Sequence, residues 1–525
     1  MSDRTFISRR QALLGSAAGA AGLAFGAYSP RHALAEALVR PLPIPTLIEA
    51  RDSDPVTLSL QNGRHRFAPA GAAVPSSGIS SSYLGPVVRV RSGDTIAFRV
   101  VNRLDEATTL HWHGLLIPSD VDGGPHNTIA PGGTWTPELT INQPAATHWF
   151  HPHPHGNTAK QVYGGLAGLM IVSDGADRDR GLPQTYGVDD LPLVLQDKRF
   201  GRNGEFAYRP TMMDVMHGLQ GDTLLVNGAV APVARVPAGL VRLRVLNAAN
   251  ARNFDLRFSD RRPFHVVGGD AGLLAEPVEV RSLVVAPAER YEILVNFSNG
   301  RPVELVTGPD VHRGMGPGMM TMQGGRPPAA APLMRFAPDP TLKAAVTHLP
   351  RALTRLAAPD PRTAVARRSF VLNPMMGMGM GGGMGMGGGM MGMGMMVSAS
   401  AGGAAGNAGH DHAAMAQMMG INGRAFDMTR IDVTTRRGSS EIWDIRSDAM
   451  AHPFHIHGVS FRILRNNGRP PSPAQAGWKD VVLVQDRAEI LLRFEHPAPA
   501  EMPFMFHCHI LEHEDHGMMG QFAVV

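Results

Sequence analysis

Residues 507–518 read HCHILEHEDHGM and contain Cys508, the only cysteine of the 525-residue chain. Histidines flank this cysteine on both sides, a third follows at position 513, and a methionine follows at position 518. Thiolate, imidazole and a weakly bound thioether are the ligands of a blue-copper electron-transfer site. Neighbouring side chains on a strand point to opposite faces. We therefore expect Cys508 to face one metal centre, and the two flanking histidines to face another.

Three further histidine clusters occur earlier in the chain. They read HWH at 111–113, HPH at 151–153 and HPFHIH at 452–457. Each His-x-His pair places two imidazoles on one face of a strand. Zinc is the main alternative to copper, but structural zinc sites are closed cages of four Cys or His ligands. Because so many histidines and a single thiol do not divide into such cages, the clusters indicate more than one metal centre of another kind.

The motifs HWHG, HPHPH, HPFHIHG and HCHILEHEDHGMM resemble those of the multicopper oxidases, and the resemblance covers nearly the whole chain. Within that family, the segments INGRAFDM (421–428), AGWKD (476–480) and HCHILEHED (507–515) are most similar to the bacterial copper efflux oxidases, which are periplasmic cuprous oxidases. Short strands separated by Gly and Pro turns indicate Greek-key sandwiches. The resemblance makes these an all-β fold of three consecutive cupredoxin-type Greek-key β-sandwich domains.

The resemblance also implies four copper ions with a specific ligand set. The type 1 copper would be bound by His452, Cys508, His513 and Met518. The type 2 copper would be bound by His111 and His455. The two type 3 coppers would be bound by His113, His151, His153, His457, His507 and His509.

Other residues carry expected roles around these ions. Asp122 and Glu514 occupy positions of proton-delivery carboxylates in the family, although Asp122 could instead be a turn residue before two glycines. Asp448 and Met450 match two ligands of a substrate copper. Two further histidines, His155 and His516, match no ligand position and are expected to be bystanders.

Composition excludes some classes of partner. The chain holds 60 glycines and 42 prolines, which suits a β-rich protein with many turns. Its formal charge of +4 comes largely from residues 1–35, which hold four arginines and one aspartate, so about +1 remains for the rest. We therefore expect no nucleic-acid partner. No segment has the roughly 18 unbroken apolar residues of a membrane span.

The first 35 residues resemble an export signal. Ser8-Arg9-Arg10 opens a twin-arginine pattern, a weakly apolar stretch follows to about Tyr28, and Ala33-Leu34-Ala35 offers a cleavage site after Ala35. We expect twin-arginine export to the periplasm. An intramolecular disulfide is excluded by the single cysteine.

Strand and turn signals predict domains over residues 40–175, 190–340 and 365–525. In the first, Val87–Arg91 and Thr95–Val101 read as strands on either side of a turn. Asn422-Gly423 in the third domain repeats Asn227-Gly228 in the second, which indicates repeated modules. The second domain has no His-x-His motif and no cysteine, so it is expected to lack metal ligands and to act as a spacer. A copper cluster would then lie between the first and third domains.

The third domain carries a methionine- and glycine-rich insert, residues 375–419, and a shorter tract spans Met315 to Met322. Met375–Met396 consists of 11 methionines and 11 glycines, which cannot pack a core and disfavour a helix. Thioethers select Cu(I), so the insert predicts cuprous-ion collection. Copper efflux oxidases have a helical insert with an acidic ligand, whereas no acid lies between Asp360 and Asp411 here.

These observations predict a monomeric copper oxidase that converts Cu(I) to Cu(II) for copper tolerance, with O2 reduced to water. Two alternatives remain. An open type 1 site would favour laccase-like oxidation of phenolic or aromatic donors. A protein of this fold could also sequester copper without catalysis.

Overall fold

A computed structural model of the chain describes residues 40–310, 330–374, 419–447 and 450–525, apart from positions 53, 70, 203 and 207. Four predicted features lie outside the described residues: the export signal, Asp448, and the methionine-rich stretches 315–322 and 375–418. Among the helices of the described ranges, none is long and apolar enough to cross a membrane.

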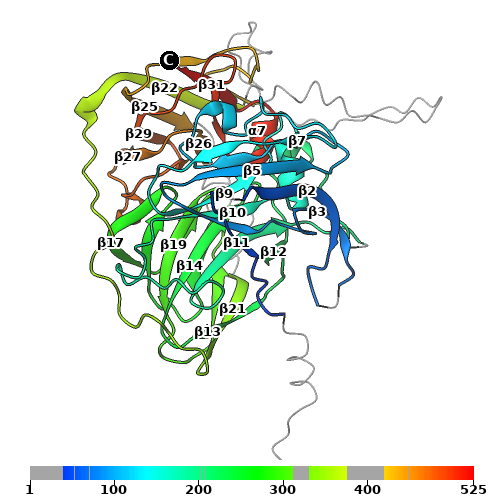
Figure 1. The fold of residues 1–525 in the computed structure, drawn as a ribbon, viewed down its shortest axis with the longest axis vertical. Helices are drawn as coiled ribbons and strands as arrows, with labels where there is room; N and C mark the ends of the chain where they lie inside the picture. Colours follow the sequence, from blue (N-terminus) through cyan, green and yellow to red (C-terminus); the bar gives the residue numbers. More distant parts are fainter. Residues whose placement is uncertain are drawn as a thin grey trace, which may run out of the picture. The chain divides into compact units, whose positions relative to one another are not determined.

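The first sandwich packs two sheets, of order β1-β4-β10-β9-β6 and β3-β2-β5-β7, with β8 also paired to β5 (Figure 1). The predicted strands β4 and β5 are both present, but the turn between them carries the chain from one sheet to the other. The elements are β1 (Leu47–Glu49), β2 (Val56–His65), β3 (Val74–Ile79), β4 (Val87–Arg91), β5 (Thr95–Asn102), β6 (His111–His113), η1 (Ser119–Val121), β7 (Thr134–Trp135), β8 (Glu138–Thr140), β9 (Ala146–His151), α3 (Thr158–Gly164) and β10 (Gly168–Ser173).

The second sandwich packs a sheet of order β12-β11-β14-β19-β16-β17 on one of order β13-β21-β20-β15-β18. Its one helix in the described ranges, α4, lies between β11 and β12 in the chain. The elements are β11 (Asp190–Lys198), α4 (Met212–His217), β12 (Thr223–Val226), β13 (Val233–Pro237), β14 (Leu240–Asn247), β15 (Phe254–Phe258), β16 (Phe264–Gly269), β17 (Gly272–Val280), β18 (Leu283–Val285), β19 (Arg290–Asn296), β20 (Val303–Thr307) and β21 (Ala331–Asp339).

The third sandwich packs a sheet of order β23-β22-β25-β29-β27 on one of order β24-β31-β30-β26-β28. The histidine motifs of this domain lie in β26 and β30, which are neighbours in the second sheet. The elements are η2 (Pro361–Thr363), β22 (Ala364–Pro374), β23 (Met419–Ile421), β24 (Val433–Thr435), β25 (Ser440–Ser447), β26 (His452–Ile456), β27 (Phe461–Asn466), η3 (Pro473–Gln475), β28 (Val481–Val484), β29 (Arg487–Arg493), β30 (Phe504–Cys508), α7 (Leu511–Asp515) and β31 (Met519–Val524).

The three sandwiches repeat one topology. Strand β2 runs parallel to β5, β11 to β14, and β22 to β25, each time within one sheet of a sandwich. In the facing sheets, β4 runs parallel to β10, β13 to β21, and β24 to β31. The prediction of three consecutive cupredoxin-type Greek-key β-sandwiches is therefore confirmed.

The Asn-Gly repeats seen in the sequence adopt the same local structure. Asn227 has φ 50° and Asn422 has φ 54°, so both occupy the left-handed region that asparagine tolerates in tight turns. The side-chain oxygen of Asn227 accepts a hydrogen bond from Val194 N–H at 2.7 Å, and that of Asn422 accepts one from Val371 N–H at 2.8 Å. Each turn is thereby tied to the first strand of its own sandwich.

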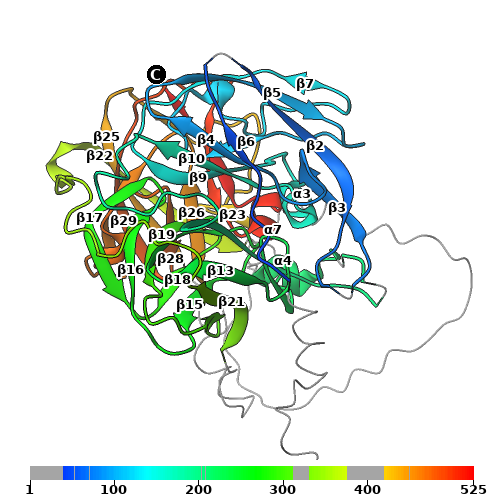
Figure 2. The same cartoon turned by 60° about the horizontal axis from the view of Figure 1, so that its bottom comes forward.

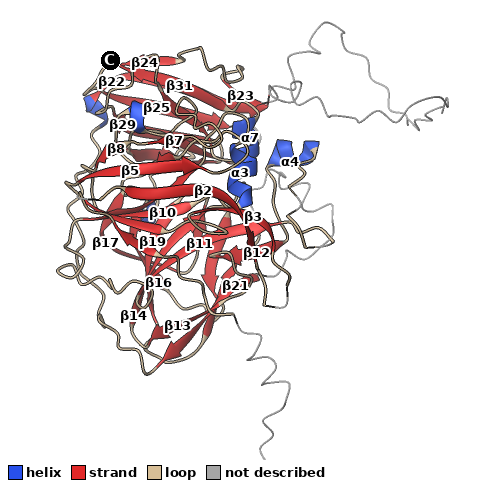
Figure 3. Ribbon diagram, turned by 45° about the vertical axis from the view of Figure 1, so that its right-hand side comes forward, coloured by secondary structure: helices blue, strands red, loops and turns tan. Residues whose placement is uncertain are grey.

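Three short helices surround the end of β30. Helix α7 follows β30 directly and contacts both α3 of the first sandwich and α4 of the second (Figures 2 and 3). The hydrophobic core of the third sandwich includes Cys508 and Met518. The cysteine therefore lies where all three sandwiches contribute structure.

Candidate metal centre

Cys508 ends strand β30 and forms a buried group with two histidines from different segments. Its Sγ lies 3.3 Å from His452 Nδ1 and 3.7 Å from His513 Nδ1, and the two nitrogens are 3.2 Å apart. Strand β26 carries His452, and α7 carries His513. Met518 is fully buried, and its backbone oxygen accepts a hydrogen bond from Cys508 N–H at 3.1 Å. All four residues predicted for the type 1 copper therefore lie together.

The chemistry of this group suits a metal cation. Burial raises the pKa of the Cys508 thiol well above its ordinary value, so a thiolate here needs a positive charge beside it. Burial also lowers the pKa of His452 to about 3, which leaves its ring neutral. His513 Nε2 lies 3.3 Å from the backbone oxygen of Met216, so this nitrogen holds the proton and Nδ1 keeps a lone pair toward Cys508. One copper ion would satisfy these three donors.

Eight further imidazoles converge on the other side of β30. His507 and Cys508 are neighbours, and their side chains point to opposite faces, as predicted for a strand. His507 Nε2 lies 3.2 Å from the Nε2 atoms of both His153 and His457. The full group, buried throughout, consists of His111, His113, His151, His153, His455, His457, His507 and His509.

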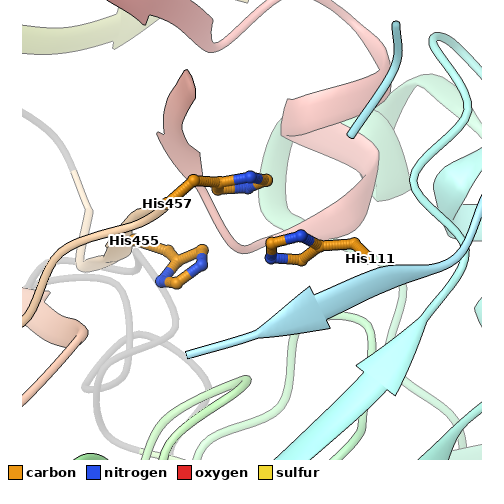
Figure 4. A group of neighbouring side chains, drawn as sticks. All are labelled: His111, His455 and His457. Carbon is orange, nitrogen blue, oxygen red and sulfur yellow. The ribbon is translucent and has the colours of Figure 1, made fainter. Parts of the chain in front are cut away.

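The group joins the first and third sandwiches. His111 extends from β6 of the first sandwich toward His455 and His457, which come from β26 and the turn after it (Figure 4). The His111 and His457 rings stack with centroids 3.8 Å apart, and those of His113 and His455 stack at 3.7 Å. Histidines separated by more than 300 residues thus form one cluster.

Hydrogen bonding shows which ring nitrogens are free to bind a metal. Nδ1 of His111 lies 3.0 Å from the backbone oxygen of Asp122, and Nδ1 of His455 lies 2.8 Å from that of Asp480. His151 and His507 direct Nδ1 to backbone oxygens in the same way, at 2.9 and 3.1 Å. Because a carbonyl can only accept, each Nδ1 carries the proton and each Nε2 presents a lone pair. Among the described residues, Nε2 of His111, His151 and His455 has no hydrogen-bond partner.

Burial keeps four of the cluster histidines uncharged. It lowers the pKa values of His113, His151, His455 and His457 well below the ordinary value, and neighbouring imidazoles lower them further. Neutral imidazoles are the metal-binding form. Buried lone pairs that converge without hydrogen-bond donors are costly unless a cation joins them. The residues present therefore fit a multinuclear copper cluster.

Two buried carboxylates contact the cluster, and both are residues that the sequence singled out. Asp122 Oδ2 lies 2.7 Å from His457 Nδ1 and 3.3 Å from His111 Nδ1. Glu514 lies 3.1 Å from His507 Nδ1 and 3.5 Å from His153 Nδ1. Burial alone would raise the pKa of Glu514, but the two histidines outweigh burial and hold the pKa below its ordinary value. Asp122 also caps the short helix η1, so it is a turn residue and a cluster neighbour at once.

A third carboxylate, Asp480, was not predicted. Its Oδ1 lies 3.1 Å from His113 Nε2, and its backbone oxygen holds His455, so it orients two cluster histidines. Arg290 of the second sandwich donates to both carboxylate oxygens, at 2.6 and 2.5 Å. The segment AGWKD was noted only as a family resemblance, and Arg290 lies 190 residues away, where no local pattern marks it.

The glycine of the HWHG motif accommodates this ion pair. A Cβ atom on Gly114 would lie 2.4 Å from Asp480 Oδ2 and 2.7 Å from Arg290 Nη2. Gly114 also has φ 86°, which side chains rarely adopt. The HWHG motif therefore supplies two histidines, and its glycine leaves room for the Asp480 carboxylate that orients His113. The second sandwich, by supplying Arg290, is more than a spacer.

The remaining predicted residues are placed as follows. Met450 is half-buried and packs against the core that contains Cys508, while Asp448 lies outside the described residues. His155 stacks edge-on with Phe426 at 5.2 Å, and His516 Nδ1 lies 2.6 Å from the backbone oxygen of Glu512. Neither belongs to the groups of potential metal ligands found among the described residues.

Family comparisons agree with this geometry. Family models described as multicopper oxidase match residues 61–177, 198–304 and 404–525. The cell division protein FtsP of Escherichia coli (strain K12) is 36% identical to this chain, with 99% of each chain covered.

Solved structures are also similar. A laccase-like multicopper oxidase, CueO, from the lignin-degrading bacterium Ochrobactrum sp., with oxidase activity towards lignin model compounds, is 47% identical. The match covers 92% of this chain and 100% of that chain, with a TM-score of 0.80. A laccase from Pediococcus acidilactici is 33% identical, with 93% and 94% of the two chains covered and a TM-score of 0.74.

Proposed function

This chain belongs to the multicopper oxidase family, and from that premise we propose that it oxidises Cu(I) to Cu(II) and couples four such oxidations to the reduction of one O2 to two waters. The observation that carries the proposal is the complete donor set: one thiol and two imidazoles on one face of β30, and eight imidazoles on the other. A protein that kept this fold without binding metal would have no need for buried, unpaired imidazole nitrogens.

We assign four coppers to these donors. The type 1 site takes His452, Cys508 and His513, with Met518 as a weak axial ligand. The type 2 site takes His111 and His455, and the type 3 pair takes the other six histidines of the cluster. Bound there, copper would supply one-electron acceptance at the type 1 site and four-electron oxygen reduction at the cluster. The peptide through Cys508, His507 and His509 provides the short covalent path between them.

Carboxylates of this chain would deliver the protons that the reduction of O2 consumes. The Asp122 carboxylate accepts the Nδ1 proton of His457 and lies 3.3 Å from His111 Nδ1, and the Glu514 carboxylate lies 3.1 Å from His507 Nδ1. Each fixes the ring orientation, and each is an ionisable group at the cluster edge that can pass a proton inward. Asp480 has only the orienting role, because Arg290 occupies both of its oxygens.

The type 1 site is covered by other parts of the chain, which favours Cu(I) as the donor rather than bulky aromatic molecules. His452, Cys508 and His513 are buried, and the backbone of Met216 lies across the outer nitrogen of His513. A laccase-like site would leave that imidazole edge open to an aromatic ring. Met450, at the edge of the same core, is a thioether of the kind that selects Cu(I). Asp448 and Met450 together are proposed as ligands of the substrate copper.

Aromatic donors are the second candidate. The observation in their favour is the 47% identity to the Ochrobactrum enzyme with activity towards lignin model compounds. A third, non-enzymatic candidate is copper sequestration, and the likeness to FtsP also allows a non-catalytic role in cell division. Absence of O2 uptake with every donor, in a protein that binds copper, would favour that third group. We further propose that the protein acts as a monomer in the periplasm, after twin-arginine export and cleavage near Ala35.

Oxygen uptake with stabilised Cu(I) tests the proposal. The wild type is compared with the Asp448→Ala/Met450→Ala double variant, with a phenol as the control donor. High Cu(I) turnover that falls in the variant, while phenol turnover survives, supports the cuprous oxidase. Faster turnover of phenols than of Cu(I), unaffected by the double substitution, makes the protein a laccase-like oxidase instead.

A further inference from the structure

Helix α4 has an unusual composition for a surface helix. Its six residues read MMDVMH, so it carries three thioethers and one imidazole. With 3.6 residues per turn, Met212, Met216, Met213 and His217 fall on one continuous arc of about 140°. Asp214 and Val215, on the remaining face, are buried, whereas Met212 is 47% and Met213 is 61% exposed. The four side chains thus share one arc, along which Met212 and Met213 are exposed and Met216 and His217 are half-buried.

Met212 and Met213 have no packing role that would explain them, whereas Met216 packs against the core of the third sandwich. Methionine is ordinarily a flexible core filler. Met212 and Met213 are among the few large hydrophobic side chains of the described residues that are strongly exposed. Isolated exposed apolar residues are normal, but adjacent ones beside an imidazole form a soft-ligand surface.

The same helix touches the type 1 site. Met216 packs against the core that contains Cys508 and Met518, and its backbone oxygen lies 3.3 Å from His513 Nε2. Figure 3 shows α4 beside α7, which carries His513. A metal ion bound by the Met216 thioether would therefore be linked to a type 1 ligand through the Met216 residue and one hydrogen bond.

We propose that α4 is a docking site for substrate Cu(I), held by the thioethers of Met212, Met213 and Met216 and the imidazole of His217. The proposal rests on the proposed function and adds a site distinct from Asp448 and Met450. Thioethers and imidazole together suit Cu(I), and thioethers hold Cu(II) weakly, so the product ion leaves.

Electron transfer at this site balances simply. The docked Cu(I) loses one electron and becomes Cu(II). With copper held by His452, Cys508 and His513, that electron would pass through Met216 and the hydrogen-bonded ring of His513 to the bound ion. Four such oxidations, with four protons from solvent, would balance the reduction of one O2 to two waters. Helix α4 therefore covers the type 1 site, and its hydrogen bond to His513 provides the path for the electron.

Silver binding tests the site independently of turnover. Ag(I) is a redox-inert substitute for Cu(I), and its binding to the copper-loaded enzyme is measured by titration calorimetry. We expect the Met212→Leu/Met213→Leu/Met216→Leu variant to bind one Ag(I) fewer than the wild type. Leucine conserves volume, so the fold is retained. Met428→Leu, a half-buried methionine outside α4, is the matched control and should bind as the wild type does. Unchanged Ag(I) stoichiometry in the triple variant overturns the proposal.

Reduction of the blue copper gives the second measurement. Under anaerobic conditions, Cu(I) should bleach the triple variant at least about tenfold more slowly than the wild type, the factor equivalent to 1.4 kcal/mol of lost binding. Bleaching by hexacyanoferrate(II), which needs no soft ligands, should be unchanged. His217→Gln should share the Cu(I) defect in part. If the triple variant loses one Ag(I) but the wild type does not turn over Cu(I), the docking site stands and the proposed function fails. Intact Cu(I) bleaching in the triple variant sinks the docking site alone.

Discussion

At the scale of single residues, Cys508 is the point where two centres meet. Its Sγ faces His452 and His513, while the histidines on either side of it belong to the other cluster. Because burial disfavours the thiolate of Cys508, this side chain is either a metal ligand or an unreactive thiol.

Replacing Cys508 with serine separates these two readings. Serine keeps the size of the side chain but offers a hard hydroxyl oxygen in place of a soft thiolate. We expect the variant to lose its blue absorption, to bind three coppers where the wild type binds four, and to lose turnover. Absorption spectroscopy and metal analysis measure this. Retained blue colour or retained oxidase turnover in Cys508→Ser would contradict the whole assignment.

Glu514 permits a second test at the same scale. Glu514→Gln removes the negative charge 3.1 Å from His507 Nδ1, so proton supply and ring orientation should both suffer. We expect oxygen reduction to slow by about 10–100-fold, with the blue copper still reducible by Cu(I). Stopped-flow reduction and reoxidation separate the two steps.

The neighbouring residue supplies the control. Asp515 is half-buried, and its carboxylate accepts hydrogen bonds from Thr158 N–H and Ala159 N–H at 2.8 and 2.9 Å. Asp515→Asn should lower stability by about 1–3 kcal/mol and leave reoxidation unchanged. Equal reoxidation rates in Glu514→Gln and the wild type would remove Glu514 from proton delivery.

At the scale of elements, α4 shows what holds a short helix in place. Six residues do not form a stable helix alone. Thr211 and Asp214 form a capping box, and Arg199 donates two hydrogen bonds to Asp214, at 3.0 and 2.6 Å. Burial would raise the pKa of Asp214, but these partners lower it to about 2. Because the pKa of Asp214 is lower in the folded protein than in the unfolded chain, the ionised carboxylate stabilises the fold fully above about pH 4. This stabilisation is lost as the pH falls toward about 2. The clamp is therefore intact at neutral pH.

Asp214→Ala should release α4 from the type 1 site. Without the cap and the ion pair, Met216 no longer covers His513, so we expect slower Cu(I) oxidation and faster oxidation of a phenol. The comparison is steady-state oxygen uptake with each donor at neutral pH. Asp260→Ala, which removes an exposed carboxylate paired with Arg262, is the control and should change neither rate. A phenol rate that stays at the wild-type level in Asp214→Ala would show that α4 is not a barrier.

Local patterns in the sequence predicted much of the fold and of the ligand set, for physical reasons that differ from residue to residue. The alternation in Val87–Arg91 and the Asn-Gly turns are properties of short segments, so they are legible without the fold. The convergence of His111 with His457 is a long-range contact, and it followed only from the family resemblance. Asp480 and Arg290 were not predicted, because their role depends on contacts with each other and with His113, all of which are far apart in the sequence. The face of α4 escaped because nothing local places it against His513.

At the scale of the whole molecule, the second sandwich connects the other two. Arg290 starts β19 and binds Asp480 of the third sandwich, and also donates to the backbone oxygen of Thr147 in the first, at 3.1 Å. Asp480 in turn contacts His113 of the first sandwich. Asp270, also of the second sandwich, lies 3.0 Å from Lys479 Nζ. A domain that contributes none of the cluster histidines thus contacts the residues that orient them.

Asp480→Asn tests that arrangement. The amide keeps one acceptor oxygen but opposes a second donor to Arg290 Nη2, and the negative charge is lost. Because His113 loses its charged partner, and the Asp480 backbone that holds His455 loses its support from the ion pair with Arg290, we expect copper affinity at the cluster to fall by about 10–100-fold, with the blue absorption retained. Loss of a buried partner should also cost about 3–5 kcal/mol of stability. Copper analysis, electron paramagnetic resonance of the type 2 copper, and denaturant unfolding measure these three effects.

Asp190→Asn is the matched control, because it should destabilise the fold without displacing the cluster histidines. Asp190 is buried and binds Arg244 through both oxygens, at 2.7 and 3.0 Å, but it touches none of the cluster histidines. Both substitutions should therefore destabilise the fold to a similar extent, and only Asp480→Asn should alter the type 2 signal. Equal copper loss in the two variants would mean that the second sandwich supports the cluster only by keeping the protein folded. A type 2 signal altered in Asp480→Asn alone would mean that the ion pair with Arg290 sets where His113 and His455 stand.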